Sequence, residues 1–243
     1  MFYYHTMKIA VYGMGRFGYF WASILAEQFE VAGYNRSARE FPERVKRITK
    51  NELRGYDTVF LCCAISSVEE VLGEIAPHIK PDAVVIDTCS VKVAPAEAMQ
   101  RLLPETAGII ATHPMFGPDS GKNGIEGLPI VFCPVREVND CFRFWLRIFR
   151  QMQLDIHEMS PDEHDKEAAF TQGITHFIGR VLKELDLKES PIATLGYKKL
   201  REIVEQTGND PLQLFIDLQR YNPHTEEMRI RLRKALDDTM GLF

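Results

Sequence analysis

The sequence predicts an α/β protein in which a doubly wound parallel β-sheet is followed by a small all-helical domain. Short apolar runs alternate with amphipathic segments along the first part of the chain, which is typical of parallel strands joined by helices. A glycine-rich loop follows the first apolar run, and strand signals stop near Met159. The chain has 243 residues, of which 45% are hydrophobic, and is long enough for a first domain over 1–158 and a second over 159–243.

Apolar runs bounded by turn-forming residues give the expected strands 8–12, 29–34, 58–64, 83–87, 108–112, 129–133 and 154–158. Amphipathic segments between them give the expected helices 20–26, 68–79 and 92–103. Residues 1–6 precede the first strand, and we expect them either to be disordered or to extend it.

The second domain is predicted to begin with a capped helix. Ser160-Pro161-Asp162-Glu163 has the hydroxyl N-cap, the N1 proline and the N3 glutamate of a capping box, and the helix is expected to run to about Leu185. The remainder indicates helices that are broken near Ser190-Pro191, over 208–211 and at Asn222-Pro223.

The segment Gly13-Met14-Gly15-Arg16-Phe17-Gly18 lies between a strand and a helix, which is the context of a dinucleotide-binding fingerprint of the Rossmann type. Gly13 permits the tight turn, Gly15 leaves room for the pyrophosphate, and Gly18 allows the helix to pack closely on the strand. The phosphates would lie on the free N–H groups of the helix N-terminus. All six residues are therefore predicted to bind the cofactor, and the alternative is a set of turn glycines without a ligand.

The end of the second strand bears on the choice of nucleotide. Asn35, Arg36 and Ser37 occupy the position, about 20 residues past the glycines, where an NAD enzyme usually carries an acidic residue. Arg36 and Ser37, with Arg39 as a further candidate, have the chemistry to bind a 2′-phosphate, which predicts NADP with NAD as the alternative. The other interpretation is an ordinary solvated basic loop that continues over 44–47. We also assign Cys63 and Ala64, at the end of the third predicted strand, to the cofactor site.

His113 is predicted to lie at the end of an apolar strand. Pro114 holds it extended, and turn-forming residues follow over 115–121. Open α/β sheets place their chemistry at this edge, and imidazole accepts a proton near neutral pH. His113 is therefore a candidate general base, and the alternative is a histidine that only hydrogen-bonds its own loop.

Composition excludes several other classes of function. The net charge is −5 and the basic residues form no tract, so a role at nucleic acid or a membrane surface has no electrostatic support, and an anionic small-molecule substrate must meet local cations. The five cysteines lack metal-ligand spacing and indicate reduced thiols in a cytoplasmic protein. The histidines show no ligand pattern, so we expect no metal.

Four motifs together resemble the prephenate and arogenate dehydrogenases of tyrosine biosynthesis. They are the glycine fingerprint, Asp87-Thr88-Cys89-Ser90-Val91-Lys92, His113-Pro114-Met115-Phe116-Gly117, and Glu163-His164-Asp165 followed by Thr175-His176-Phe177. The resemblance spans most of the chain. It implies oxidative decarboxylation of a cyclohexadienyl substrate, with hydride passed to NAD(P)⁺ and loss of CO₂. Prephenate is the expected substrate, and arogenate is the alternative.

The resemblance implies that His113 is the catalytic histidine and that Ser90 assists it. Ser90 can orient the substrate hydroxyl or the imidazole, or it can act as the N-cap of the helix expected over 92–103, and both roles can hold at once. Lys92 is assigned a structural role.

The capped helix of the second domain carries a polar stripe. Regular helical periodicity places Gln172 and His176 each within about 20° of Asp165, so Gln172 and His176 are predicted to bind the substrate. An interdomain hydrogen-bond network is the alternative. The family uses an arginine of this domain to bind a substrate carboxylate. Here His224 lies near that position with Arg220 beside it, so these two are also candidates, and prephenate, arogenate and a related ring acid all stay open.

Two other classes of function remain as alternatives: a different NADP-dependent oxidoreductase, such as an imine or β-hydroxyacid reductase, and a catalytically silent nucleotide sensor. The second domain also has more apolar positions than a few helices can bury, which predicts a homodimer joined through Leu195, Leu200, Ile203, Val204, Leu212, Leu214, Phe215, Ile216 and Leu218.

Overall fold

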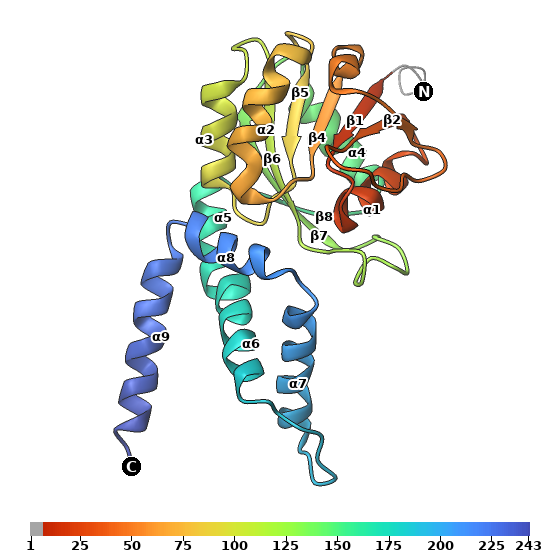
Figure 1. Cartoon of the computed structure of the whole chain (residues 1–243). Coiled ribbons are helices and arrows are strands. Elements are labelled where there is room, and N and C mark those ends of the chain that lie inside the picture. Colours follow the sequence, from red (N-terminus) through yellow and green to blue (C-terminus); the bar gives the residue numbers. More distant parts are fainter. Residues whose placement is uncertain (1–6) are drawn as a thin grey trace. The chain divides into compact units, whose positions relative to one another are not determined.

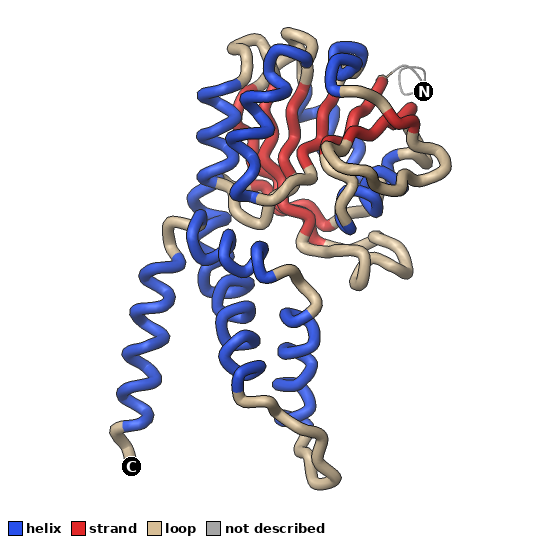
Figure 2. Tube along the Cα trace, in the orientation of Figure 1, coloured by secondary structure: helices blue, strands red, loops and turns tan. Residues whose placement is uncertain are grey.

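The structure is a computed structural model that describes residues 7–243, and the expectation for residues 1–6 lies outside them. The chain divides into two compact units, the first ending at Pro161 and the second running from Asp162 to Phe243. Among the described residues, the strands all lie in the first unit, whereas the second is helical (Figure 2). The predicted α/β class with a helical C-terminal part is confirmed. Sequence analysis placed the domain boundary after residue 158.

The first unit is built on one eight-stranded sheet with the strand order β3-β2-β1-β4-β5-β6-β7-β8 (Figure 1). The strands are β1 (Lys8–Tyr12), β2 (Glu30–Tyr34), β3 (Lys46–Arg47), β4 (Thr58–Leu61), β5 (Val84–Asp87), β6 (Gly108–Pro114), β7 (Pro129–Arg136) and β8 (Asp155–Glu158). All seven predicted strands are present. The short strand β3 was not predicted, because two charged residues carry no apolar pattern.

One pairing departs from the predicted all-parallel sheet. β6 and β7 are antiparallel, with His113 opposite Val131 and a register shift between Ile109 and Ile110, whereas β7 and β8 are parallel to each other. The connection over 115–128 contains no helix, so it reverses the chain instead of crossing over the sheet. This connection therefore starts at the same sheet edge as the loop that follows β1.

Helices cover both faces of the sheet (Figure 1). On one face lie α2 (Val68–Ile75) and α3 (Val93–Leu102), and on the other lie α1 (Arg16–Leu25) and α4 (Cys141–Gln151). Short 3₁₀ turns complete the unit: η2 (Lys50–Gly55), η3 (Ile65–Ser67) and η4 (Ala76–His78). Both faces of the central strands are buried, which is why these strands appear in the sequence as continuous apolar runs.

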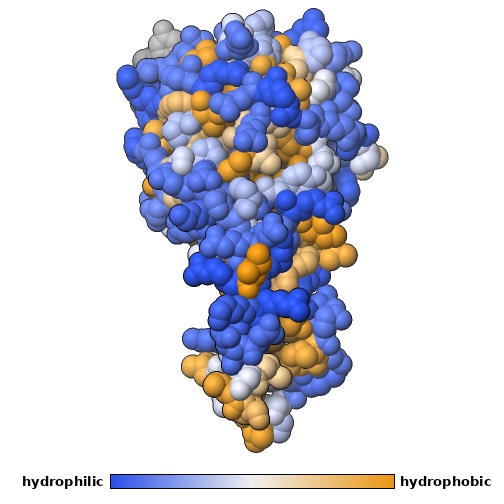
Figure 3. Space-filling view, turned by 90° about the vertical axis from the view of Figure 1, so that its left-hand side faces the viewer, coloured by the Kyte–Doolittle hydropathy of each residue, from blue (hydrophilic) through white to orange (hydrophobic). Residues whose placement is uncertain are grey.

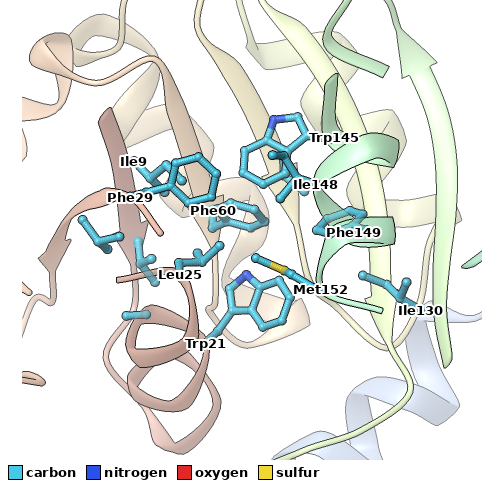
Figure 4. Packing of buried hydrophobic residues seen from close by; sticks show 14 of the residues in the cluster. Ile9, Trp21, Leu25, Phe29, Phe60, Ile130, Trp145, Ile148, Phe149 and Met152 are labelled. Carbon is cyan, nitrogen blue, oxygen red and sulfur yellow. The ribbon is translucent and has the colours of Figure 1, made fainter. Parts of the chain in front are cut away.

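An aromatic cluster fixes α1 and α4 against the sheet (Figure 4). The ring of Phe60 on β4 makes edge contacts with Trp21 of α1 at 5.9 Å and with Trp145 of α4 at 5.0 Å between centroids. Trp145 also packs on Phe149 one turn later in α4. Because large aromatic side chains dominate core energetics, this cluster gives α1, and hence the glycine loop before it, a rigid base.

The second unit contains α5 (Pro161–Ala168), the π-helical segment η5 (Ala169–Gly173), α6 (Ile174–Glu184), α7 (Leu195–Gly208), α8 (Leu212–Tyr221) and α9 (Thr225–Met240). The predicted breaks over 208–211 and at Asn222-Pro223 are confirmed. The α6 and α7 backbones approach closely at Gly179, where a Cβ atom would lie 2.2 Å from Oγ1 of Thr207.

The π-helical segment η5 corrects one expectation. A π-turn inserts an extra residue, which rotates everything after it by about 100° relative to an uninterrupted α-helix. Asp165 lies before η5 and His176 after it, so the stripe computed from a uniform 3.6-residue period does not hold across the segment.

None of the described helices is long and apolar enough to cross a membrane. Within residues 7–243, no group of three or more His, Cys, Asp or Glu side chains is placed to hold a metal ion.

Candidate active site

The glycine loop after β1 has the geometry that its sequence requires. Gly13 has φ +102°, a conformation that L side chains rarely adopt, and its N–H donates to the carbonyl of Tyr34 at 2.8 Å. A Cβ atom on Gly13 would lie 2.3 Å from the carbonyl oxygen of Cys62 on the neighbouring strand connection. Only glycine fits here, because both the turn and the approach of β4 exclude a side chain.

The next two glycines have different environments. A Cβ atom on Gly15 would meet nothing within 4 Å, whereas one on Gly18 would lie 1.7 Å from the carbonyl oxygen of Gly13. Gly18 is therefore a packing glycine, and Gly15 faces open space at the start of α1. No side chain caps this helix end, so its first N–H groups are available to an anion. The loop consequently fits a dinucleotide pyrophosphate.

Asn35 stabilises the glycine loop from the end of β2. Its Oδ1 accepts from the N–H of Met14 at 2.8 Å, and its Nδ2 donates to Ser37 at the carbonyl oxygen and at Oγ. Of the three candidates at this strand end, Asn35 thus holds the loop in shape, and Arg36 and Ser37 are left exposed for a ligand.

Arg36 and Ser37 line an open hollow of about 740 Å³ at the ends of β2 and β3. The hollow also contains Arg47 and Lys50, which sequence analysis did not assign to the site. Arg47 lies in β3, beside Gly33 of β2, and its guanidinium stacks on the ring of Phe41 at 4.8 Å. Three cations therefore converge on one hollow beside the glycine loop. The sequence did not indicate that Arg47 and Lys50 reach this hollow, because β3 is two charged residues long and has no strand pattern.

Two carboxylates of α2 counter these cations. Glu70 accepts from Arg36 at 2.6 Å, and Glu74 accepts from Lys50 at 3.4 Å and from the hydroxyl of Tyr12 at 3.3 Å. Burial, and then the charge of Glu74, raise the pKa of Tyr12, so this hydroxyl stays a donor. The two cations are thus held in place before any ligand binds.

Cys63 and Ala64 follow β4, directly beside the glycine loop. The backbone nitrogen of Cys63 is 3.4 Å from the position of a Cβ on Gly13, so the predicted proximity of these cofactor candidates is present. Burial, followed by the charge of Asp87, raises the pKa of the Cys63 thiol to about 12. Cys63 is therefore an uncharged lining group and not a nucleophile.

His113 is the penultimate residue of β6, which continues to Pro114 beyond the predicted end at residue 112. Its exposure is 3%, and β5 ends at Asp87 opposite Ala111, so His113 lies beyond the end of the neighbouring strand. Because β1, β4, β5 and β6 are parallel, His113 is at the sheet edge that carries the glycine loop. Three strand spacings, about 14 Å, separate β1 from β6. An extended dinucleotide bound along this edge can span that distance.

A buried ion pair is hydrogen-bonded to the backbone of Thr112, the residue before His113. Asp87 and Lys92 are both 0% exposed, and Nζ of Lys92 donates to Oδ1 of Asp87 and, at 2.5 Å, to the carbonyl oxygen of Thr112. Burial raises the pKa of Asp87, and the charge of Lys92 opposes that rise. The structural role of Lys92 is therefore to connect the end of β5 to β6.

Ser90 lies in the turn between β5 and α3 and is half-buried. Sequence analysis gave Ser90 two roles, and one of them, the N-cap of this helix, is wrong. The helix begins at Val93 with Lys92 at the N-cap position, and no side chain caps it. Five residues, 88–92, connect β5 to α3, and Ser90 lies two positions before the N-cap. The role of Ser90 as an assisting hydroxyl stays a prediction.

Arg16 connects the glycine loop to the segment after His113. Its Nη2 lies 3.0 Å from both carboxylate oxygens of Asp119, a residue of the connection between β6 and β7. Phe20 of α1 contacts Phe116 in the same connection with ring centroids 6.4 Å apart. The glycine loop with α1 and the connection after His113 are therefore in contact at one sheet edge of the first unit, although Arg16 and Asp119 are 103 residues apart in the sequence.

In the second unit, three buried polar atoms spaced four residues apart have no hydrogen-bond partner among the described residues. They are Oε1 of Gln172, Nδ1 of His176 and Nε of Arg180. Nε2 of His176 lies 3.8 Å from a carboxylate oxygen of Asp210, and Arg180 donates to the carbonyl oxygen of Asp210 at 3.0 Å. Burial lowers the pKa of His176 more than Asp210 raises it, so the imidazole is neutral near pH 7. Sequence analysis named Gln172 and His176 but missed Arg180 and Asp210.

Among the described residues of the second unit, no recorded contact joins His224 or Arg220 to Gln172, His176 or Arg180. Nε2 of His224 lies 2.8 Å from Asp162, and its backbone nitrogen donates to Asn222. Arg220 is exposed at the end of α8. Their assignment as substrate-binding residues stays a prediction.

Comparisons with known proteins agree with this geometry. Residues 32–153 match the family model described as "Prephenate dehydrogenase, nucleotide-binding domain", and residues 181–242 match "TYRAAT1-like, C-terminal domain". The chain is 36% identical to arogenate dehydrogenase 2, chloroplastic, of Arabidopsis thaliana over 96% of this chain and 68% of that protein. The chain belongs to the prephenate/arogenate dehydrogenase family. It shares the Rossmann-like fold of the family with a helical C-terminal region.

One further relative resembles this chain in sequence, and one solved structure resembles it in fold. Arogenate dehydrogenase 1, chloroplastic, of the same plant is also 36% identical, over 95% of this chain but only 38% of its own length. The crystal structure of prephenate dehydrogenase from A. aeolicus in complex with hydroxyphenyl propionate and NAD⁺ has a TM-score of 0.75 at 17% identity, covering 98% of this chain and 90% of that one. This chain thus spans between about two fifths and two thirds of the two Arabidopsis proteins.

Proposed function

We propose that this chain catalyses the NADP-dependent oxidative decarboxylation of arogenate, a cyclohexadienyl amino acid. The observation that carries the proposal is the position of His113 at the C-terminal end of β6, on the sheet edge that also carries the glycine loop. A base at this edge and a nucleotide loop on the same edge are what hydride removal from a hydroxylated carbon requires.

In this proposal the imidazole of His113 accepts the proton of the ring hydroxyl as the C–O bond gains double-bond character. Hydride leaves the same carbon, the bond to the ring carboxylate breaks, and CO₂ departs as the ring becomes an aromatic phenolate. The phenolate oxygen then takes the proton back from His113, which gives the phenol product and restores the neutral imidazole. The nicotinamide cofactor supplies the hydride acceptor. Ser90 orients the hydroxyl or the imidazole, and buried surroundings keep water away from His113.

The preference for NADP rests on the hollow beside β2. Arg36, Arg47 and Lys50 offer three cations, and Ser37 offers a hydroxyl, to a 2′-phosphate, while an acidic residue for a ribose hydroxyl is absent from 35–37. The crystal structure of the A. aeolicus enzyme is a complex with NAD⁺, so NAD is the alternative cofactor.

Arg36→Ala is expected to weaken NADP binding by about 10- to 100-fold, because a hydrogen bond to a charged group contributes roughly 1.5–3 kcal/mol. NAD binding should change little. The measurement is the dissociation constant of each nucleotide by fluorescence or calorimetry. Arg39→Ala is the matched control, since Arg39 is exposed nearby but does not line the hollow. Equal dissociation constants for the two nucleotides in the wild-type protein would refute the preference.

The choice of arogenate over prephenate rests on the polar group of the second unit. The carboxylate of Asp210 and Oε1 of Gln172 are acceptors that suit an ammonium group, and Arg180 is a cation that suits a carboxylate. An α-amino acid side chain presents both charges, whereas the keto acid side chain of prephenate has no ammonium. Prephenate is the second candidate, because Arg180 serves either carboxylate.

Asp210→Asn is expected to lower kcat/KM for arogenate by about 10- to 100-fold, the effect of losing one charge-assisted hydrogen bond. The value for prephenate should stay the same or rise. Initial rates with both substrates give the comparison, and Asp186→Asn, at an exposed carboxylate of the same unit, is the control. A parallel fall for both substrates would show that Asp210 does not recognise the amino group.

We also propose a homodimer in the cytoplasm. Leu195, Leu200 and Leu212 are exposed, as are several apolar side chains of α9, although Leu218 from the predicted set is buried. Figure 3 shows hydrophobic side chains on the surface of the helical second unit. All five cysteines are free thiols, which supports a reducing compartment. Light scattering should give about twice the chain mass of 27.9 kDa, and a 27.9 kDa species alone would contradict the dimer.

A further inference from the structure

We propose that Asp87 and Lys92 form a positioning pair that holds His113 and Ser90 in the geometry needed for proton transfer. The inference rests on the proposed function, because it assigns a role toward the two groups that the function uses. Neither Asp87 nor Lys92 contacts the reacting atoms in this proposal. Each acts through the backbone next to a proposed catalytic residue.

The pair joins the two segments that carry those residues. Lys92 donates to the carbonyl oxygen of Thr112, the residue immediately before His113. Asp87 Oδ1 accepts from the N–H of Cys89 at 2.9 Å, which shapes the turn leading to Ser90. In addition, the hydroxyl of Thr112 donates a hydrogen bond to the carbonyl oxygen of Asp87 at 2.6 Å. One buried cation therefore fixes the end of β5, the Ser90 turn and the backbone before His113 together.

Stability alone does not account for a charged pair at this place. Both side chains are fully buried, and removing two charges from water carries a desolvation penalty that well-packed apolar residues of similar volume would avoid. One carboxylate oxygen of Asp87, Oδ2, is also buried without a hydrogen-bond partner among the described residues. A directional tie is what the charged pair adds, because the three N–H bonds of an ammonium orient a carbonyl as an apolar side chain cannot.

A second Asp–Lys pair on the same sheet provides a comparison. Asp57 and Lys80 lie at the opposite edge, just before β4 and β5, and are about one third exposed. They also tie neighbouring strands, since Asp57 accepts from the backbone N–H of Lys8 at 2.9 Å. This pair has the same chemistry but is remote from both His113 and Ser90.

The test is the neutral double variant Asp87→Asn/Lys92→Met, compared with the control Asp57→Asn/Lys80→Met. Turnover with NADP⁺ and arogenate or prephenate, nucleotide binding and thermal unfolding are measured on the full chain. We expect kcat of the first variant to fall by about 10²-fold, with KM and nucleotide affinity changed less than threefold, because small displacements of reacting groups act on the transition state. The control should keep its kcat whatever its unfolding temperature.

A kcat within threefold of wild type in the folded first variant would overturn the positioning role. An equal loss of kcat in the control would do the same, since it would show a general effect of strand ties. If the first variant does not fold, Thr112→Val replaces it, with an expected severalfold loss of kcat at unchanged KM, and an unchanged kcat there overturns the proposal. A wild-type protein that is inactive with both substrates refutes the proposed function itself, and the positioning role with it.

Discussion

His113→Asn is expected to lower kcat by about 10²- to 10⁴-fold, the usual effect of losing a general base. The strand around residue 113 should keep its shape, because asparagine retains a hydrogen-bonding amide and the pairing of β6 with β7 is made by backbone groups. NADP affinity should change little, since the glycine loop and the hollow beside β2 are built from other residues. Steady-state rates together with nucleotide titration measure both quantities.

The pH profile provides the control for this variant. In the wild-type protein, kcat/KM should rise through an acidic limb as the base loses its proton, and that limb should vanish in His113→Asn. A loss of kcat smaller than about tenfold would move the base elsewhere, with His176 as the next candidate. Loss of NADP binding together with activity would indicate a structural role for this strand end.

Lys92→Met is expected to lower the free energy of unfolding by about 3–5 kcal/mol near neutral pH, because it leaves Asp87 as an uncompensated buried charge. Burial already raises the pKa of Asp87, and Lys92 is the main group that opposes this rise. Without Lys92 the folded-state pKa should rise further. A carboxyl with a raised folded-state pKa contributes stability that is present below its unfolded pKa and is lost as pH rises through the folded value.

The deficit of Lys92→Met relative to wild type should therefore shrink toward pH 5 and grow toward pH 8. Urea unfolding at both pH values measures it. Lys80→Met is the matched control, and its deficit should stay near about 1 kcal/mol or less, because its partner Asp57 is partly exposed to water. A deficit of Lys92→Met that is equal at the two pH values would show that Asp87 is not the group responsible.

The glycine loop and the sheet edge could be predicted because their determinants are local. The fingerprint at 13–18 lies between an apolar strand and a helix, and the structure places each glycine where its missing side chain matters. The position of His113 followed from the apolar run before it and the proline after it. Even here the strand end was wrong by two residues, because pairing with β7 extends β6 beyond the apolar run.

The features that sequence analysis missed depend on contacts between distant segments. Arg47 and Lys50 reach the nucleotide hollow only because β3 pairs with β2, and two charged residues give no strand signal. The tie from Lys92 to Thr112 spans 20 residues and a strand pairing. The π-helical segment η5 shifted the phase between Asp165 and His176, which no 3.6-residue period can anticipate.

The measurement that tests the proposed function most directly is nucleotide reduction by the wild-type protein in four parallel reactions, with NADP⁺ or NAD⁺ and with arogenate or prephenate. We expect the highest kcat/KM for NADP⁺ with arogenate, release of one CO₂ for each nucleotide reduced, and loss of that activity in His113→Asn. Absence of nucleotide reduction in all four reactions, or reduction that persists undiminished in His113→Asn, would contradict the proposed function.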